Sequence, residues 1–273
     1  MSTTQETAQI PVIDISGGQP DAEIGRALVD AAATYGFVYV KNEGKDIPVA
    51  AINRMFDLSK QFFASPATEK EKCKITQTIP PSSGGPSFLP SRHTNGPTKS
   101  ILRLLYYPPI PPSFPSSNHL RAGAHSDYGS LTLLFRLPGQ PGLEILPPSS
   151  SIAFTPVPIH PPGTEGDVAP PVLVNIGDLL SAWTNGLLRS TVHRVVFPGE
   201  GGGDRYSIAY FAHPVGTTVL ETVPSERVRR AGLESGTSSG EGVKGMTADE
   251  YLLGRLRATY KGLYDNGEKG KGK

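Results

Sequence analysis

Apolar positions in the first third of the chain recur at helical spacing around two short apolar runs. One stripe predicts a helix over 21–35, and a second predicts a helix over about 48–63. The apolar runs 10–15 and 37–42 predict strands, the second directly after a glycine suited to ending the first helix. The charged stretch 68–74 predicts a short solvated helix. The first stripe consists of Ile24, Leu28, Ala31, Ala32 and Tyr35.

From residue 101 onward the pattern changes to short apolar or alternating runs separated by turn residues. This spacing predicts an antiparallel sandwich or open barrel, so the fold class is α+β and mainly β, with flanking helices. Thr247 and Glu250 have the form of a capping box, and the apolar residues behind them predict a closing helix. The predicted strands occupy 101–107, 131–135, 143–146, 171–176, 193–197 and 205–211.

These patterns divide the chain into three stretches that we expect to function as one domain. Residues 1–100 form an N-terminal region of helices and strands, and residues 101–265 form the β core with its closing helix. The charged, glycine-rich residues 266–273 form a disordered tail. With 273 residues, of which 37% are hydrophobic, the chain is long enough to bury a sizeable core.

Composition narrows the class of protein. A formal net charge of +1 gives no reason to expect nucleic acid or a membrane surface as a partner. The single Cys73 excludes a disulfide framework and fits a reducing compartment. The N-terminus lacks a signal-like apolar stretch, and no run approaches the roughly 20 apolar residues of a membrane span. We therefore expect a soluble, cytoplasmic protein, and the oligomeric state stays open.

His125 and Asp127 lie two residues apart in the stretch RAGAHSDYGSLTLLF. Side chains two apart on a strand point to the same face, so these two would project together. An imidazole and a carboxylate suit Fe(II), Mn(II) or Zn(II), and His193, at the start of another predicted strand, is the candidate third ligand. The alternative is an ordinary strand with polar first residues, and a core histidine at 193.

Arg205 and Ser207 are also two apart on one predicted strand. A guanidinium group binds a carboxylate in a bidentate fork, and a nearby hydroxyl adds a third donor. A buried arginine needs an anion, and no acidic residue in the neighbouring strands is an obvious partner. The carboxylate of a small molecule is therefore one candidate, and a surface salt bridge near the strand end is the other.

The ordered set HSD at 125–127, STVHRVV at 190–196 and RYS at 205–207 resembles the Fe(II)/2-oxoglutarate-dependent dioxygenases. The chain is similar to the isopenicillin N synthase-like branch over most of its length. It looks especially like fungal members of that branch, such as thymine 7-hydroxylase-type enzymes. The N-terminal PVIDIS and GFVYVKNEG add to this likeness. The resemblance implies a double-stranded β-helix core (jelly-roll, cupin-like) and a fungal type of secondary metabolism.

The resemblance also implies cofactors and their contacts. Fe(II), 2-oxoglutarate and O2 would be required, with ascorbate as a candidate reductant. Oxidative decarboxylation would release succinate and CO2 while a substrate C–H bond is oxidised, by hydroxylation, desaturation or a related reaction. Leu105 stands where the branch often has Asn, so the Tyr107 contact is only partly supported. The implied metal ligands are His125, Asp127 and His193, and the implied 2-oxoglutarate contacts are Arg205, Ser207 and Tyr107.

Three further residues are candidates for substrate contact by the same resemblance. Tyr128 and Phe211 would stack on a planar, polar ring, and Arg103 would donate hydrogen bonds to it. The alternative places Phe211 in the core and pairs Arg103 with a carboxylate. Neither alternative identifies the substrate.

The chain departs from the branch in two places. The proline-rich stretch 156–171 lengthens the separation of the metal ligands, and we expect it to be a surface loop. Between Lys74 and Ile101 the branch normally has a much longer segment with a helix packed on the barrel. Losing that helix would expose an apolar face and open the site to water.

These observations leave more than one hypothesis. The first is an oxygenase that oxidises a small organic metabolite. The second is a catalytically impaired barrel protein of the same fold, acting as a binding or interaction module because the segment is missing. A Zn(II) hydrolase with the same three ligands leaves the RYS motif unexplained and lacks an evident general base.

Overall fold

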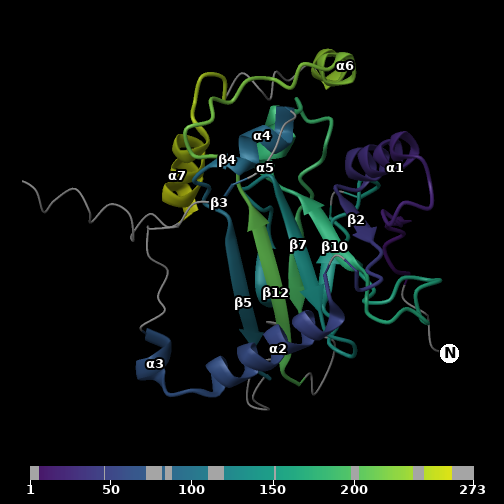
Figure 1. The fold of residues 1–273 in the computed structure, drawn as a ribbon, viewed down its shortest axis with the longest axis vertical. Coiled ribbons are helices and arrows are strands. Elements are labelled where there is room, and N and C mark those ends of the chain that lie inside the picture. Colours follow the sequence, from purple (N-terminus) through teal and green to yellow (C-terminus); the bar gives the residue numbers. More distant parts are fainter. Residues whose placement is uncertain are drawn as a thin grey trace, which may run out of the picture.

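The computed structural model describes residues 6–45, 47–71, 82–83, 88–109, 120–150, 152–197, 203–235 and 243–259. Two β-sheets form its core, with helices around them (Figure 1). The larger sheet has the strand order β1-β2-β10-β7-β12-β5, and the smaller has the order β6-β11-β8-β9. Only the β1–β2 pair is parallel among these strands; the others pair antiparallel. A two-stranded sheet pairs β3 with β4.

The strands fall where the apolar runs predict them, with additional short strands between. The larger sheet contains β1 (Val12–Ile13), β2 (Phe37–Val40), β10 (Val172–Ile176), β7 (Leu131–Arg136), β12 (Arg205–Ala212) and β5 (Ile101–Tyr107). The smaller sheet contains β6 (Leu120–His125), β11 (His193–Val196), β8 (Leu143–Ile145) and β9 (Thr155–Pro156). The third sheet contains β3 (Ser82–Ser83) and β4 (Asn95–Gly96).

The helices gather at the two ends and one side of the larger sheet. Figure 1 shows α4, α5 and α7 at one end, α2 and α3 at the other, and α1 beside β2. None of the described helices is long and apolar enough to cross a bilayer. The helices are α1 (Asp21–Thr34), α2 (Val49–Ala64), α3 (Ala67–Glu71), α4 (Phe88–Thr94), α5 (Asp178–Trp183), α6 (Glu226–Ser235) and α7 (Ala248–Thr259).

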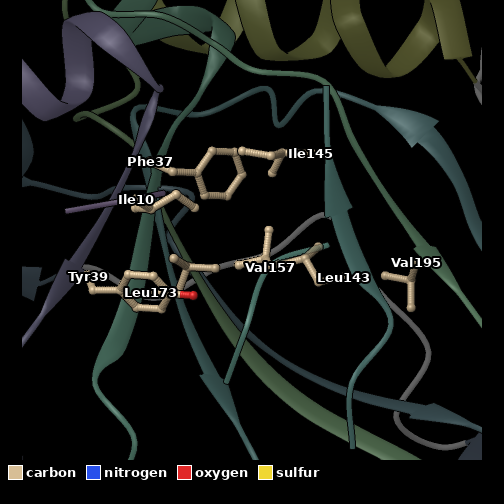
Figure 2. Close-up of a cluster of buried hydrophobic side chains, with 8 residues drawn as sticks. All are labelled: Ile10, Phe37, Tyr39, Leu143, Ile145, Val157, Leu173 and Val195. Carbon is tan, nitrogen blue, oxygen red and sulfur yellow. The ribbon is translucent and has the colours of Figure 1, made fainter. Parts of the chain in front are cut away.

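A core of apolar side chains fills the space between the two sheets (Figure 2). Alternation along each strand produces it, because every second residue of β2 and β10 points toward the smaller sheet. The opposite face of β2 packs on α1, where Val38 meets Ile24 and Ala31. The inner cluster consists of Ile10, Phe37, Tyr39, Leu143, Ile145, Val157, Leu173 and Val195.

Among the described helices, α2 covers part of the outer face of the larger sheet. The helix α2 packs against β12 and β5, and in Figure 1 it crosses one end of these strands. On this face Leu102 is 48% exposed and Tyr210 is 38% exposed. Beside Tyr210, which pairs with Leu133, is a hollow of about 280 Å³. Apolar residues of β2, β7 and β10 line one part of it, and residues 15–16, 41–43, 45 and 47 line the rest. The expectation that the chain lacks a covering helix concerns residues 75–100, part of which lie outside the described residues, and it stays a prediction.

Most predicted elements are confirmed, and one expectation is wrong. The helices predicted over 21–35, about 48–63 and after Thr247 are present, and the stretch 68–74 is helical as far as Glu71. The remainder of that stretch and the tail 266–273 lie outside the described residues. The stretch 156–171 is not a surface loop throughout, because Val157 and Ile159 are buried. Proline and glycine predict irregular backbone, and they do not predict its exposure.

Candidate metal centre and carboxylate pocket

His125 and His193 come together because their strands pair. His125 ends β6, His193 begins β11, and the two residues are direct partners in the antiparallel register. Their ring centroids lie 4.4 Å apart. Asp127 Oδ1 lies 3.9 Å from His125 Nε2 and 3.8 Å from His193 Nε2. Each of the three residues therefore offers one ligand atom, and these three atoms lie within 4.8 Å of one another.

The structure corrects the reason for this convergence. The sequence predicts His125 and Asp127 on one strand, with alternation pointing both to the same face. Instead β6 ends at His125, and Asp127 lies in the turn between β6 and β7. The turn, and not strand alternation, brings the carboxylate toward the two rings.

Both imidazoles are oriented by backbone carbonyl groups. His125 Nδ1 lies 2.7 Å from the carbonyl oxygen of Gly123, and His193 Nδ1 lies 3.1 Å from that of Thr191. A carbonyl oxygen can only accept a hydrogen bond, so each Nδ1 is a donor, and in a neutral ring the lone pair then lies on Nε2. Each Nε2 lone pair is then free on the side of Asp127. Burial lowers the pKa of His193 below its usual value, which also favours the neutral, ligating form.

Two residues that the sequence analysis did not identify orient the carboxylate. Asp127 Oδ2 accepts hydrogen bonds from Thr132 Oγ1 at 2.6 Å and from Asn175 Nδ2 at 2.8 Å. Thr132 and Asn175 are partners in the β7–β10 pairing and are both buried. Oδ1 is left facing the two histidines. The signal in the sequence is that Thr132 and Asn175 are each a polar residue within an otherwise apolar strand.

The donor set fits a divalent transition metal. Two neutral nitrogens and one carboxylate oxygen, each held by a second hydrogen bond, match the facial two-histidine, one-carboxylate arrangement. Asp127 and His193 are each 8% exposed, whereas the side chain of His125 is 47% exposed. The site is therefore closed on one side and reachable by a small molecule on the other.

Arg205 is a buried cation without a described anionic partner. It is 2% exposed, which excludes the surface salt bridge. Its Nε donates to the Pro141 carbonyl at 3.2 Å, its Nη1 donates to Ser207 Oγ at 3.3 Å, and its guanidinium lies 5.1 Å from the centre of the Tyr107 ring. No carboxylate among the described residues forms an ion pair with it. Burial lowers the pKa of Arg205 to about 10.

Two further arginines strengthen the positive field around Arg205. Arg136 and Arg121 both lie close enough to lower its pKa by repulsion, after the larger effect of burial. Arg136 is itself 6% exposed and donates to the carbonyls of Val157 and Ile159. A cluster of cations inside a protein is stabilised by a bound anion. The pocket therefore has the chemistry of a carboxylate site.

One cavity joins the two sets of residues. Its wall includes the three residues of the triad, the Arg205 and Ser207 pair, and Tyr107. Apolar side chains from both sheets complete the wall, Leu105 and Phe211 among them.

The structure separates the three candidates for substrate contact. Phe211 lines the cavity. Arg103 is exposed and lies on β5, two residues from Leu105 and so on the same face, but it is not part of the wall. Tyr128 is directed toward α7, where its hydroxyl contacts Thr259 Oγ1 and its ring lies 5.0 Å from the Arg255 guanidinium. This position favours contact between Tyr128 and α7 over contact with a molecule in the cavity.

Comparison with known proteins gives two family matches. Residues 98–214 match the 2OG-Fe(II) oxygenase superfamily, and residues 10–121 match the N-terminal region of non-haem dioxygenases in morphine synthesis. A UPF0676 protein of Schizosaccharomyces pombe is 31% identical over 92% of this chain and 93% of its own length. The 2-oxoglutarate-dependent dioxygenase htyE of Aspergillus rugulosus is 41% identical over 50% of this chain, which spans 41% of that relative.

Solved structures agree with the fold. The crystal structure of Neurospora crassa thymine 7-hydroxylase with α-ketoglutarate and thymine matches with a TM-score of 0.68 and 25% identity. The match covers 92% of this chain and 97% of the hydroxylase. The alignment with the fission-yeast relative extends over 323 positions, whereas this chain has 273 residues. That relative therefore contains segments with no counterpart here.

Proposed function

The chain belongs to the 2OG-Fe(II) oxygenase superfamily and is a 2-oxoglutarate-dependent oxidoreductase, and we propose that its metal ligands are His125, Asp127 and His193. We propose further that Arg205 and Ser207 bind the distal carboxylate of 2-oxoglutarate, with Tyr107 beside them. The observation that carries this assignment is that both sets line one cavity. A metal site and an unpaired buried cation in the same cavity match a cosubstrate with two carboxylate ends.

The protein's own residues have two tasks at the metal position. Thr132 and Asn175 keep one carboxylate oxygen of Asp127 occupied, so that the other points to the metal position. The carbonyl groups of Gly123 and Thr191 hold the two Nδ1 atoms, so that each Nε2 faces the metal position. These contacts preorganise the ligands before any metal arrives, which reduces the entropy lost on binding.

When bound, Fe(II) would supply the chemistry of O2 activation, with 2-oxoglutarate as the electron source and succinate and CO2 as products. The chain positions the cosubstrate and excludes water from the cavity. Arg205 anchors the cosubstrate at the end remote from the metal, because its fork accommodates both oxygens of a carboxylate. The apolar wall around the triad, Leu105 and Phe211 included, keeps water from the reacting atoms.

The substrate is a small organic molecule. Thymine is bound in the structure of the Neurospora hydroxylase, which supports a compact, planar and polar compound for this chain. Phe211, on β12, offers an aromatic face in the cavity wall. Arg103 offers a cation on β5, on the same face of that strand as the cavity residue Leu105. We propose that these two residues contact the substrate, and that the reaction is a hydroxylation, a desaturation or a related C–H oxidation.

Anaerobic addition of Fe(II) and 2-oxoglutarate to the protein tests the assignment. We expect a weak visible charge-transfer band in the wild type, no band in H193A, and an unchanged band in H160A. His160 is a suitable control because its ring lies in the 156–171 stretch and contacts the Thr164 carbonyl instead of the triad. Absence of the band in the wild type would refute the metal and cosubstrate assignment.

Exposure of the loaded protein to air separates the enzyme from the binding module. The enzyme forms succinate, slowly without a substrate and faster with one, and screening a small-metabolite library for faster succinate formation identifies the substrate class. A band without any succinate would favour a protein that binds the cosubstrate and has lost turnover.

A further inference from the structure

The carboxylate of Asp178 accepts hydrogen bonds from three separate segments. Asp178 is the first residue of α5, and its side chain is 16% exposed. Its Oδ1 accepts from Ser190 Oγ at 2.6 Å, and its Oδ2 accepts from Ser126 Oγ at 3.0 Å. The guanidinium of Arg255, on α7, also donates to Oδ2. The carboxylate therefore links three parts of the chain that are distant in sequence.

Two of these segments carry the metal-binding triad. Ser126 stands between His125 and Asp127, and Ser190 lies three residues before His193. The backbone N–H of Asp178 also donates to the carbonyl oxygen of Asp127 at 2.7 Å. Asp178 thus touches the segment of each ligand without being one of the three residues that surround the metal position.

Close packing at the start of α5 supports the same link. The N–H groups of Gly177 and Leu179 donate to carbonyls of the turn at residues 128–130. A Cβ atom on Gly177 would lie 2.2 Å from the carbonyl oxygen of Gly129, so only glycine permits this approach. The turn that presents Asp127 is therefore held against α5 by backbone contacts as well as by the Asp178 side chain.

The C-terminal helix α7 contacts the same turn at two points. Arg255 donates to Asp178 and stacks on Tyr128, and Thr259 contacts the Tyr128 hydroxyl. Figure 1 shows α7 and α5 at the same end of the larger sheet. An exposed ion pair alone contributes little to stability, but this arginine completes the set of donors to a carboxylate that is largely buried.

We propose that Asp178 is a positioning residue for the metal centre, and that Arg255 couples the C-terminal helix to it. The proposal rests on the metal site proposed above. A carboxylate can accept all three hydrogen bonds, whereas an amide in its place presents only one acceptor oxygen. Without the charge, the two ligand-bearing segments lose their common anchor, and the three ligand atoms no longer hold the spacing that the metal requires.

Titration of the metal-free protein with Co(II) alone tests this proposal. We expect the Co(II) dissociation constant of D178N to rise by about 10- to 100-fold, the usual effect of losing a residue that orients ligands. We also expect the visible d–d spectrum of the bound Co(II) to change shape. S126A and R255Q should weaken Co(II) binding by smaller factors. D30N is the matched control, because Asp30 on α1 pairs with Arg227 on α6 at 2.6 Å and neither residue lines the cavity of the metal site.

Thermal melts of the metal-free variants distinguish positioning from general support. A D178N protein that melts lower but binds Co(II) with wild-type affinity and spectrum would overturn the proposal. If D178N does not fold, S126A and R255Q test the proposal in its place. Wild-type Co(II) binding by both of these variants would also overturn the proposal. Failure of the wild type to bind Co(II) would instead refute the metal site itself, a result separate from an unaffected D178N.

Discussion

Replacing Arg205 by Met distinguishes the effect of its buried charge on stability from the effect of that charge on 2-oxoglutarate binding. Burial lowers the pKa of Arg205 from its usual value to about 10, a shift of roughly two and a half units. Since one pKa unit corresponds to about 1.4 kcal/mol, keeping this guanidinium charged costs the ligand-free protein about 3 kcal/mol near neutral pH. The folded pKa lies below the unfolded one, so this cost is present throughout the neutral range and declines only above pH 10. Met has similar length and carries no charge.

We therefore expect opposite effects of R205M on stability and on binding. The metal-free, 2-oxoglutarate-free protein should melt at an equal or higher temperature, by up to roughly 5 °C, because the uncompensated charge is gone. The affinity for 2-oxoglutarate should fall by about 2–5 kcal/mol, which corresponds to a factor between about 30 and more than 1,000. Affinity for Co(II) should be nearly unchanged, since Arg205 is not part of the triad.

Arg194 supplies the matched control for this experiment. It is the neighbour of His193, but its Nε donates to Glu144 Oε2 at 2.7 Å, and the Glu144 side chain is 12% exposed. R194M should lower the melting temperature, because it leaves a carboxylate without its cation, and should leave 2-oxoglutarate binding unchanged.

Anaerobic titration of 2-oxoglutarate into the Fe(II)-loaded protein, followed by its visible band, measures the cosubstrate affinity. Co(II) titration and thermal melts measure the metal affinity and the stability. Wild-type 2-oxoglutarate affinity in R205M would refute the carboxylate site. Equal losses of Co(II) and 2-oxoglutarate affinity would show that the two sets of residues are assigned wrongly.

Three further variants test the surroundings of the site. T132V removes the hydroxyl that donates to Asp127 at 2.6 Å, so Co(II) affinity should fall by about 10-fold or more, and an unchanged titration would contradict the orienting role. H213L should reduce the loss of stability at acid pH. Burial lowers the pKa of His213 to about 4, so the free energy of unfolding of the wild type falls by up to about 3 kcal/mol between pH 6.5 and 4. Identical stability–pH profiles of the two proteins would exclude His213 as the cause. G177A places a Cβ 2.2 Å from the Gly129 carbonyl, so urea melts should show a loss of about 1–3 kcal/mol, and a wild-type melt would show that the turn can move without cost.

The residues of the site differ in how readily the sequence reveals them. His125, Asp127 and Arg205 were identifiable because charged or ligating side chains at the starts and ends of apolar runs are chemically conspicuous. Thr132 and Asn175 were not identifiable. A single polar residue within an apolar strand can be an irregularity of the pattern or a residue with a specific contact, and the sequence does not distinguish the two. Their role depends on the register of β7 against β10, which aligns them opposite one another under Asp127.

Two features of the structure depend on contacts with distant segments, and one of them overturns an expectation. The 156–171 stretch was expected on the surface, but Val157 and Ile159 enter the core, and Arg136 binds their carbonyls. Tyr128 contacts Thr259 and Arg255 of α7, and its contact with a substrate stays a prediction. In both cases the local sequence describes the backbone correctly, and the partner comes from a distant segment that local sequence does not specify.

The sequence by itself determined the elements and the chemistry available: the period of apolar positions sets helix or strand, and the side chains of His, Asp and Arg set which ligands and charges exist. Tertiary structure alone decided which of them act together. The pairing of β6 with β11 opposes the two histidines, the turn after β6 brings in the carboxylate, and α5 fastens that turn through Asp178. These are long-range contacts, and they follow from how two sheets pack and register, a property of the whole chain and not of any window within it.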